Sequence, residues 1–196
     1  MLAVHKLSVS GLNWDGNLLW LAIPEKHLVA CYDPATGESE EKLRYEHAVW
    51  DVCGSEEGLW MMTEGGRLGR QLVLWSFGEE KEIRKFNCPD GAAAGITIYL
   101  DRLWLTHRNN RKLFCLDPAN GKLIWMMRTE RESFSPAACG NELWFIEADL
   151  GPLGHWSASG QGKYFFARYA PVRETIVERR PVSFHPACMA LDGERF

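Results

Sequence analysis

Short apolar runs bounded by turn-forming residues recur along the whole chain at a spacing of about forty residues. The clearest marker is a Leu-Trp pair that places tryptophans at Trp20, Trp60, Trp104 and Trp144, with spacings of 40, 44 and 40 residues. Runs this short that are rich in β-branched and aromatic residues predict strands. Because no segment sustains an apolar period of 3.6 residues, we expect little or no helix.

The copy around Trp104 divides into four strands separated by turns. Its third and fourth strands are joined by Asp117, Pro118, Ala119, Asn120 and Gly121, a sequence suited to a tight turn. Proline presets φ at the first turn position, and glycine tolerates a positive φ at the last. The predicted strands of this copy are Gly95–Leu100, Leu103–Thr106, Lys112–Leu116 and Lys122–Met127.

A second periodic feature supports true repetition. Trp20, Cys31 and Asp33 each have a residue of the same type 84 positions later in the chain. A strand-rich repeat with a period in the forties is typical of β-propeller blades. We therefore predict an all-β fold, a single small propeller domain over 1–196 with four full four-stranded blades. The blades are expected at about 10–47, 48–88, 89–132 and 133–180.

The C-terminal sequence "FHPACMALDGERF" begins a fifth copy, with Asp192 and Gly193 at its turn. A partial fifth blade from 182–196 could be completed by 1–8, so that pairing of the two termini closes the ring and leaves no exposed edge. Two alternatives stay open: the chain is a piece of a longer propeller, or a second chain completes the ring through self-association.

The segment "KLFCLDPANGKLIWMMRTE" carries a family resemblance. A strand ending in Leu-Asp, then a Gly-Lys turn and a strand ending in Trp, resembles the repeat of PQQ-like propellers of the quinoprotein alcohol dehydrogenase type. The matching residues are Leu116, Asp117, Gly121, Lys122 and Trp125. The first copy keeps the Asp and Gly but lacks the Lys and Trp, and the other copies keep only the Leu-Trp strand. Related propellers such as virginiamycin lyase or glutamine cyclotransferase therefore stay open.

The resemblance implies a scaffold without the quinone. Cofactor-using members of that superfamily carry adjacent cysteines and a calcium site, whereas the six cysteines here are never closer than 22 residues. We expect neither a cofactor nor a bound metal. The absence of a Cys-x-x-Cys pair also argues against a zinc ribbon. We predict reduced cysteines on buried strand faces.

Composition narrows the classes of partner. The chain has 22 basic and 26 acidic residues, a formal charge of -4 without a basic block. This distribution argues against binding to nucleic acid or to an anionic membrane surface, because both need clustered Lys and Arg. No apolar run is long enough to span a bilayer. We expect a cytoplasmic protein whose partner is a small ligand or another protein.

Sequence motifs for catalysis are absent, but propeller topology brings distant loops together. Loops between the second and third strands, and between successive blades, share one rim. This rule groups seven histidine and carboxylate residues that could bind a ligand or perform acid-base chemistry. They are His47, Glu64, Asp90, His107, Glu147, Asp149 and His185.

The segment Asp149 to Gly162 forms a long Gly/Ser-rich insertion on the same rim, and it contains Trp156. Loops of this length in compact domains are usually functional or disordered. We predict a non-enzymatic scaffold that binds a ligand or partner through this loop face. The alternative is a small propeller enzyme, of lyase or hydrolase type, that uses the histidine and carboxylate cluster.

Overall fold

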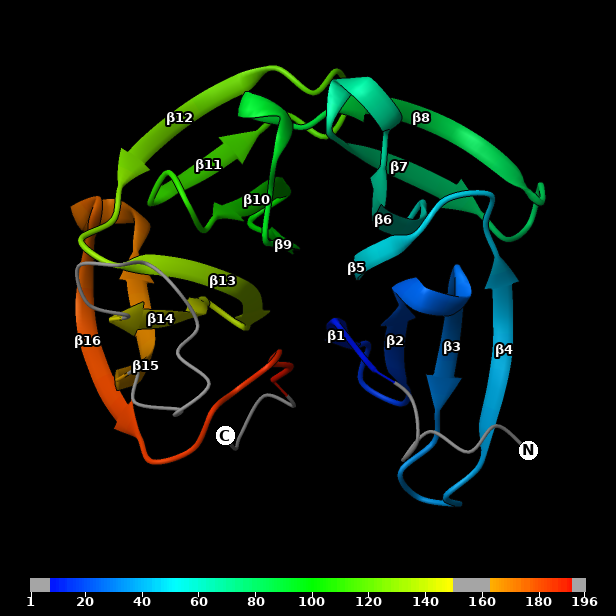
Figure 1. The fold of residues 1–196 in the computed structure, drawn as a ribbon, viewed down its shortest axis with the longest axis horizontal. Helices are drawn as coiled ribbons and strands as arrows, with labels where there is room; N and C mark the ends of the chain where they lie inside the picture. Colours follow the sequence, from blue (N-terminus) through cyan, green and yellow to red (C-terminus); the bar gives the residue numbers. More distant parts are fainter. Residues whose placement is uncertain (1–7, 150–162, 192–196) are drawn as a thin grey trace.

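The computed structural model describes residues 8–149 and 163–191, and this part of the chain forms four four-stranded antiparallel sheets arranged in a ring (Figure 1). In each sheet the strands follow sequence order, so every strand pairs only with its neighbours along the chain. This up-and-down arrangement is that of a propeller blade. The predicted all-β fold with four blades is confirmed.

The bounds of the strands, blade by blade, are as follows. Blade 1 contains β1 (Gly11–Trp14), β2 (Leu19–Ile23), β3 (Leu28–Tyr32) and β4 (Ser39–Arg44). Blade 2 contains β5 (Val49–Ser55), β6 (Gly58–Glu64), β7 (Arg70–Ser76) and β8 (Lys81–Asn87). Blade 3 contains β9 (Gly95–Tyr99), β10 (Arg102–His107), β11 (Lys112–Leu116) and β12 (Leu123–Arg128). Blade 4 contains β13 (Glu132–Cys139), β14 (Glu142–Asp149), β15 (Lys163–Ala170) and β16 (Thr175–Val182).

Short 3-10 turns are the helical elements of the described residues, as expected from the lack of a helical period. They are η2 (Pro24–Lys26), η3 (Gly66–Leu68), η4 (Pro89–Gly91) and η5 (Pro171–Arg173). None of the helices in this part of the chain is long and apolar enough to cross a membrane.

The first strand of each blade lies toward the ring axis and the fourth lies at the periphery (Figure 1). Contacts between β1 and β5, β5 and β9, and β9 and β13 join successive blades near the axis. The described strands of the copy around Trp104 agree with the predicted ones to within two residues at each end.

The repeated tryptophans occupy equivalent places in the second strand of each blade. Trp60, Trp104 and Trp144 are buried, and Trp20 is half-buried. Trp60 packs in a cluster with Leu105 of blade 3. Trp104 lies 5.5 Å from Tyr169 of blade 4, measured between ring centroids. Trp60 and Trp104 therefore fill spaces between successive blades, whereas Trp144 packs with Met189 and Leu191 of the C-terminal tail.

The two turns 84 residues apart have the same hydrogen bonds. The Asp117 carboxylate accepts a bond from the Ala119 N–H, and the Gly121 N–H donates to the Asp117 carbonyl, each at 2.8 Å. In blade 1 the Asp33 carboxylate and the Gly37 N–H make the corresponding bonds, also at 2.8 Å. The predicted repeat is therefore also present in the hydrogen bonds of these two turns.

The predicted fifth blade requires correction. Residues 183–191 form no strand, and residues 1–7 and 192–196, the other parts of that blade, lie outside the described residues. Instead, Met189 and Leu191 pack on the face of blade 4 that carries Trp144. The Met189 N–H donates to Ser135 Oγ at 2.7 Å. Apolar side chains of this tail therefore take the place that a following blade would have.

All six cysteines are free, and Cys31, Cys53, Cys88 and Cys115 are buried. Burial raises the pKa of the Cys88 and Cys188 thiols to about 12. The thiolate is the reactive form, so both groups are poor nucleophiles near neutral pH. The predicted burial is confirmed for Cys31, Cys53, Cys88 and Cys115, whereas Cys139 and Cys188 are only partly buried.

Candidate functional site

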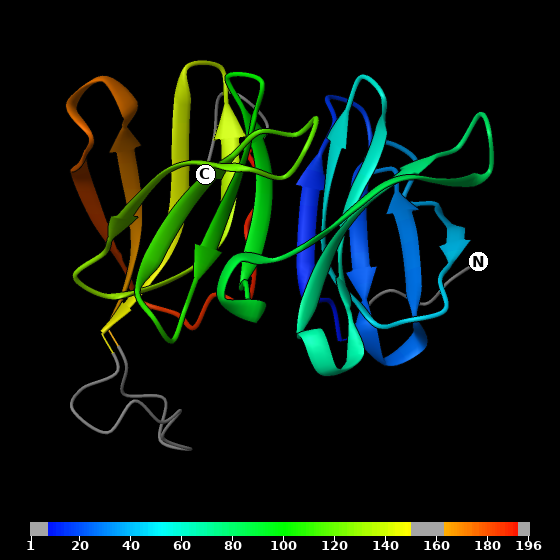
Figure 2. The same ribbon diagram turned by 90° about the horizontal axis from the view of Figure 1, so that it is seen from above.

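Loops from different blades lie on one rim of the ring, and η2, η3 and η4 are all found toward the lower edge of Figure 2. These are the connections between second and third strands and between successive blades, as the topology predicts. The turns that contain Asp33 and Asp117 lie in the other set of connections. The rim is therefore the face that brings residues distant in sequence together.

A pocket of about 470 Å³ opens between blades 2, 3 and 4 on this rim. Its wall includes small residues of 91–94, which precede β9 and leave the space open. Ionisable side chains and aromatic rings also contribute to the wall. The side chains that define the pocket are Trp50, Glu64, Arg70, His107, Arg108 and Phe134.

Arg70 begins β7, and its guanidinium carbon lies 4.6 Å from the centroid of the Trp50 ring. Its Nη1 donates a hydrogen bond to the carbonyl oxygen of Ala93, in the connection that leads into blade 3. Desolvation lowers the pKa of this arginine, with Asp51 and Glu64 among the nearby groups that oppose the shift. The group stays cationic, because an arginine pKa is far above neutrality.

Arg108 follows β10 and is held in a similar way. Its guanidinium carbon lies 5.2 Å from the centroid of the Phe134 ring, and its Nε donates to Glu132 Oε2 at 2.8 Å. Each of the two arginines therefore lies against an aromatic ring and is fixed by a further hydrogen bond. Such contacts orient a guanidinium, whose planar array of N–H donors then has a defined direction.

His107 ends β10 with only 3% of its surface exposed, and it lines the same pocket. Burial lowers its pKa, while the nearby Asp90 carboxylate acts in the opposite direction. The Asn110 N–H donates to His107 Nδ1 at 3.3 Å, and Asn110 Nδ2 lies 3.5 Å from His107 Nε2. The lowered pKa favours the neutral imidazole at pH 7.

Of the residues predicted on the rim, Glu64 and His107 line this pocket together. Asp90 lies beside it in η4 at a φ of 57° and forms an ion pair with Lys112. That contact, with desolvation opposing it, lowers the pKa of the Asp90 carboxyl. Asp90 is therefore a charged neighbour of His107 and does not line the pocket.

The other predicted site residues lie elsewhere. His47 is partly exposed beside Tyr45, and Asp149 is exposed at the end of β14. His185 packs edge-on against Tyr164 at 4.8 Å. Glu147 is fully buried, and its Oε2 accepts a bond from Arg179 Nε at 2.6 Å. Trp156 and most of its insertion lie outside the described residues.

The sequence patterns did not predict that Arg70 and Arg108 belong to a site. Neither residue is part of a motif, and both line one pocket only because of how the blades are arranged. The patterns also gave no sign of Asp51, a fully buried carboxyl on β5 whose pKa burial raises to about 8. Among the described residues, no group of three or more His, Cys, Asp or Glu side chains is placed to hold a metal ion.

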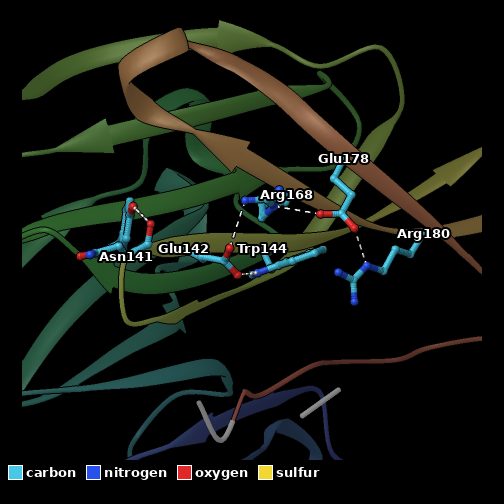
Figure 3. Close-up of polar contacts among 7 residues, drawn as sticks. Asn141, Glu142, Trp144, Arg168, Glu178 and Arg180 are labelled. Atoms are coloured by element: carbon cyan, nitrogen blue, oxygen red, sulfur yellow. Dashed lines mark hydrogen bonds and ion pairs between the residues drawn. The ribbon is translucent and has the colours of Figure 1, made fainter. Parts of the chain in front are cut away.

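A different polar cluster covers blade 4. Glu142 Oε2 accepts a bond from the Trp144 indole at 2.9 Å, and Oε1 accepts one from Arg168 at 3.0 Å (Figure 3). Arg168 also contacts Glu178, which in turn pairs with Arg180 (Figure 3). Because these side chains bond to one another, we expect them to stabilise the surface of blade 4. The rim pocket is therefore the better candidate site.

No family model matches the sequence, and no curated protein matches it. Solved structures do resemble its fold. Glutaminyl cyclase of Myxococcus xanthus has a TM-score of 0.60 at 13% identity, over 87% of this chain and 69% of that one. Hydrazine synthase of Kuenenia stuttgartiensis has a TM-score of 0.59 at 12% identity, over 93% of this chain and 52% of that one.

The WD40 repeats of RRP9 give a TM-score of 0.57 at 11% identity, over 88% of this chain and 51% of theirs. The chain thus spans about half the length of the hydrazine synthase and RRP9 chains. At these identities the likeness shows the β-propeller fold alone. The resemblance to PQQ-like repeats stays a prediction from sequence.

Proposed function

We propose that this protein is a binding propeller that holds a small anionic molecule, such as a carboxylate or phosphate compound, in the rim pocket. The observation that carries the proposal is the pair of guanidiniums, Arg70 and Arg108, each against an aromatic ring and both lining one pocket. Arginine suits planar oxyanions because its N–H groups can engage two oxygens at once.

The remaining wall supports the same ligand class. The neutral imidazole of His107 adds a polar group to the wall, and the small residues of 91–94 leave room for a ligand close to the backbone. Glu64 is the acidic side chain of the pocket wall and would favour ligands that also carry a cationic or hydroxyl group. An amino acid-like or sugar phosphate-like molecule fits this combination of charges.

The test is calorimetric titration with small carboxylates and phosphates, with and without amino groups. Arg108→Gln should weaken the binding of a true ligand by about ten- to a hundredfold, because a hydrogen bond to a charged group contributes about 1.5–3 kcal/mol. Arg84→Gln is the matched control, since Arg84 on β8 pairs with Glu57 away from the pocket. Equal loss of affinity in both variants, or no binding by wild type across the panel, contradicts the proposal.

A second candidate is an enzyme that uses Glu64 and His107, since both line the same pocket. A neutral imidazole beside a carboxylate can accept or relay a proton. Incubating each bound ligand with wild type and with His107→Gln, followed by mass spectrometry of the products, separates the two functions. Binding without turnover supports the scaffold, whereas product formation that His107→Gln abolishes supports the enzyme.

A further inference from the structure

A second pocket opens on the face of the ring opposite the rim pocket. Its volume is about 550 Å³, and all four blades contribute to its wall. The turns that join β1 to β2 and β5 to β6 lie on this face, toward the upper edge of Figure 2. The residues that characterise this turn-side pocket are Trp14, Asp15, Trp20, Glu56, Phe77 and Thr97.

The charge of the turn-side pocket is the reverse of that of the rim pocket. Two carboxylates, Asp15 and Glu56, contribute to its wall, and none of the described residues that line it is Lys, Arg or His. The rim pocket, by contrast, is lined by Arg70, Arg108 and His107. The turn-side pocket therefore favours a cationic ligand.

The Asp15 carboxylate is held in its ionised form. It accepts hydrogen bonds from the N–H groups of Asn17 at 2.9 Å and Leu18 at 2.8 Å, and from the Trp20 indole at 2.7 Å. Desolvation raises the pKa of Asp15, but these hydrogen bonds, led by that of Leu18, outweigh it and lower the pKa. A negative charge is therefore fixed beside the Trp20 ring at neutral pH.

The second carboxylate of the wall has no partner within the protein. Glu56 is exposed in the turn between β5 and β6, and it forms no ion pair or hydrogen bond with another residue in the described part of the chain. Its neighbour Glu57 does not line the pocket and pairs with Arg84 at 2.7 Å. Glu56 is therefore available to a ligand, whereas Glu57 is already neutralised.

Three aromatic rings contribute the apolar part of the wall. Trp14 and Trp20 are half-buried, and Phe77, which follows β7, is 38% exposed. The centroids of the Trp20 and Phe77 rings lie 5.5 Å apart, so the two side chains form one aromatic surface across blades 1 and 2. The face of an aromatic ring attracts a cation that lies within about 6 Å of its centroid, and tryptophan attracts it most strongly.

The inner strands contribute open space and a hydroxyl group. Gly54 on β5 lines the pocket, and a Cβ added there would have one neighbour within 4 Å, Asn13 Oδ1 at 3.5 Å. Thr97 on β9 is only 2% exposed, and its hydroxyl forms no hydrogen bond with another described residue. A buried hydroxyl normally has a partner, so its place in the wall favours a ligand with a polar group of its own.

We propose that the turn-side pocket binds a small organic cation with a methylated ammonium head and a hydroxyl group, that is, a choline-like compound. The aromatic rings contact the head, while the carboxylates of Asp15 and Glu56 balance its charge. A methylated head suits this wall better than a bare ammonium, because a compact ammonium is strongly hydrated and costs more to remove from water. This site is independent of anion binding in the rim pocket.

The first test follows the indole N–H signals of the protein by NMR spectroscopy during titration with choline. The signals of Trp14 and Trp20 should shift, whereas that of Trp144, which does not line the pocket, should stay in place. The uncharged isostere of choline, in which carbon replaces the quaternary nitrogen, should bind roughly tenfold more weakly. Inorganic phosphate should not displace choline, which separates this site from the rim pocket.

The second test assigns the residues of the wall. Glu56→Gln should weaken choline binding about fivefold, because it removes a charge that contacts the ligand. Glu57→Gln removes the same charge from the same turn and should bind choline as wild type does. Phe77→Leu keeps an apolar side chain without the ring, and it should weaken binding about threefold.

Several results overturn the proposal. They are Trp14 and Trp20 signals that do not move, binding of the isostere as tight as that of choline, equal losses in Glu56→Gln and Glu57→Gln, full affinity in Phe77→Leu, and displacement of choline by phosphate. Circular dichroism of every variant distinguishes loss of the site from loss of the fold. None of these results bears on the rim pocket, because the two pockets have no lining residue in common.

Discussion

Oδ2 of Asp51, on β5, accepts a hydrogen bond of 2.8 Å from the backbone N–H of Ile96 on β9. A single carboxyl group thus joins the inner strands of blades 2 and 3. Blade 1 approaches the same group, because a Cβ atom added at Gly11 would overlap Asp51 Oδ1. Asp51 therefore fills the space beside Gly11, and any larger residue at that position of β1 would collide with it.

This position predicts an unusual dependence of stability on pH. Burial raises the pKa of Asp51 to about 8 from 3.8, so the folded state binds its proton more tightly than the unfolded state does. The free energy of unfolding should then fall as pH rises between about 4 and 8, with a slope of up to ~1.4 kcal/mol per pH unit.

Asp51→Asn cannot ionise and should lack this decline. Its amide has one oxygen in place of the two that accept the N–H groups of Val52 and Ile96, so one of these two bonds is lost. Urea denaturation of both proteins across that pH range measures the difference in slope. Parallel pH profiles for the two proteins would show that Asp51 ionises normally.

The repeated tryptophans should contribute unequally to stability. Trp60→Ala is expected to lower the free energy of unfolding by ~3–5 kcal/mol, because the side chain is buried between two blades. Trp20→Ala should cost less than half as much, since Trp20 is half-buried and its indole donates to Asp15 at 2.7 Å in an exposed turn. Equilibrium urea denaturation tests the order, and equal losses would contradict it.

The two equivalent turn glycines provide a matched comparison. Gly37 has a φ of 73°, and no atom lies within 4 Å of the position that a Cβ would take. Gly37→Ala should therefore lower the free energy of unfolding only by the cost of placing alanine in a left-handed conformation, about 1 kcal/mol. Gly121 has a φ of 69°, and an added Cβ would lie 2.6 Å from Phe86 Cγ. Gly121→Ala should therefore cost clearly more. A thermal melt of each variant measures the difference, and the reverse order would refute the packing of this turn on blade 2.

The phenol of Tyr45 donates a hydrogen bond to the Glu82 carboxylate and so joins blade 1 to blade 2. Desolvation, aided by this contact, raises the pKa of Tyr45 well above its usual range. Spectroscopic titration should show Tyr45 still protonated when exposed tyrosines ionise. Stability supplied by this group is present below about pH 10 and declines as pH rises further, so Tyr45→Phe should be less stable by ~1 kcal/mol at pH 7 and less sensitive to alkali.

The repeat could be predicted from sequence because its signals are local. The hydrogen bonds of the Asp33 and Asp117 turns span only a few residues, and the tryptophans mark the same strand in every blade. Whether a side chain faces the pocket depends on tertiary structure. Glu147 lies near the end of β14, but its side chain is buried with Arg179.

The candidate pocket illustrates the same limit. Arg70 and Arg108 are 38 positions apart and come from different blades, so their convergence follows from how blades 2 and 3 pack. Trp50 and Phe134 read as ordinary strand residues in the sequence. Only their contacts with the two guanidiniums distinguish them from the rest of the apolar core.

Strand pairing confined to neighbours along the chain has a consequence for the order of folding. Each sheet contains only its own four consecutive strands, so no ladder must wait for a distant segment to be synthesised. Chains with short-range contacts fold quickly, and folding can follow synthesis from the N-terminus. The bond between Met189 and Ser135 spans 54 residues, so tail docking should come last. Pulse-labelling hydrogen exchange during refolding would detect this order as late protection of the Met189 amide.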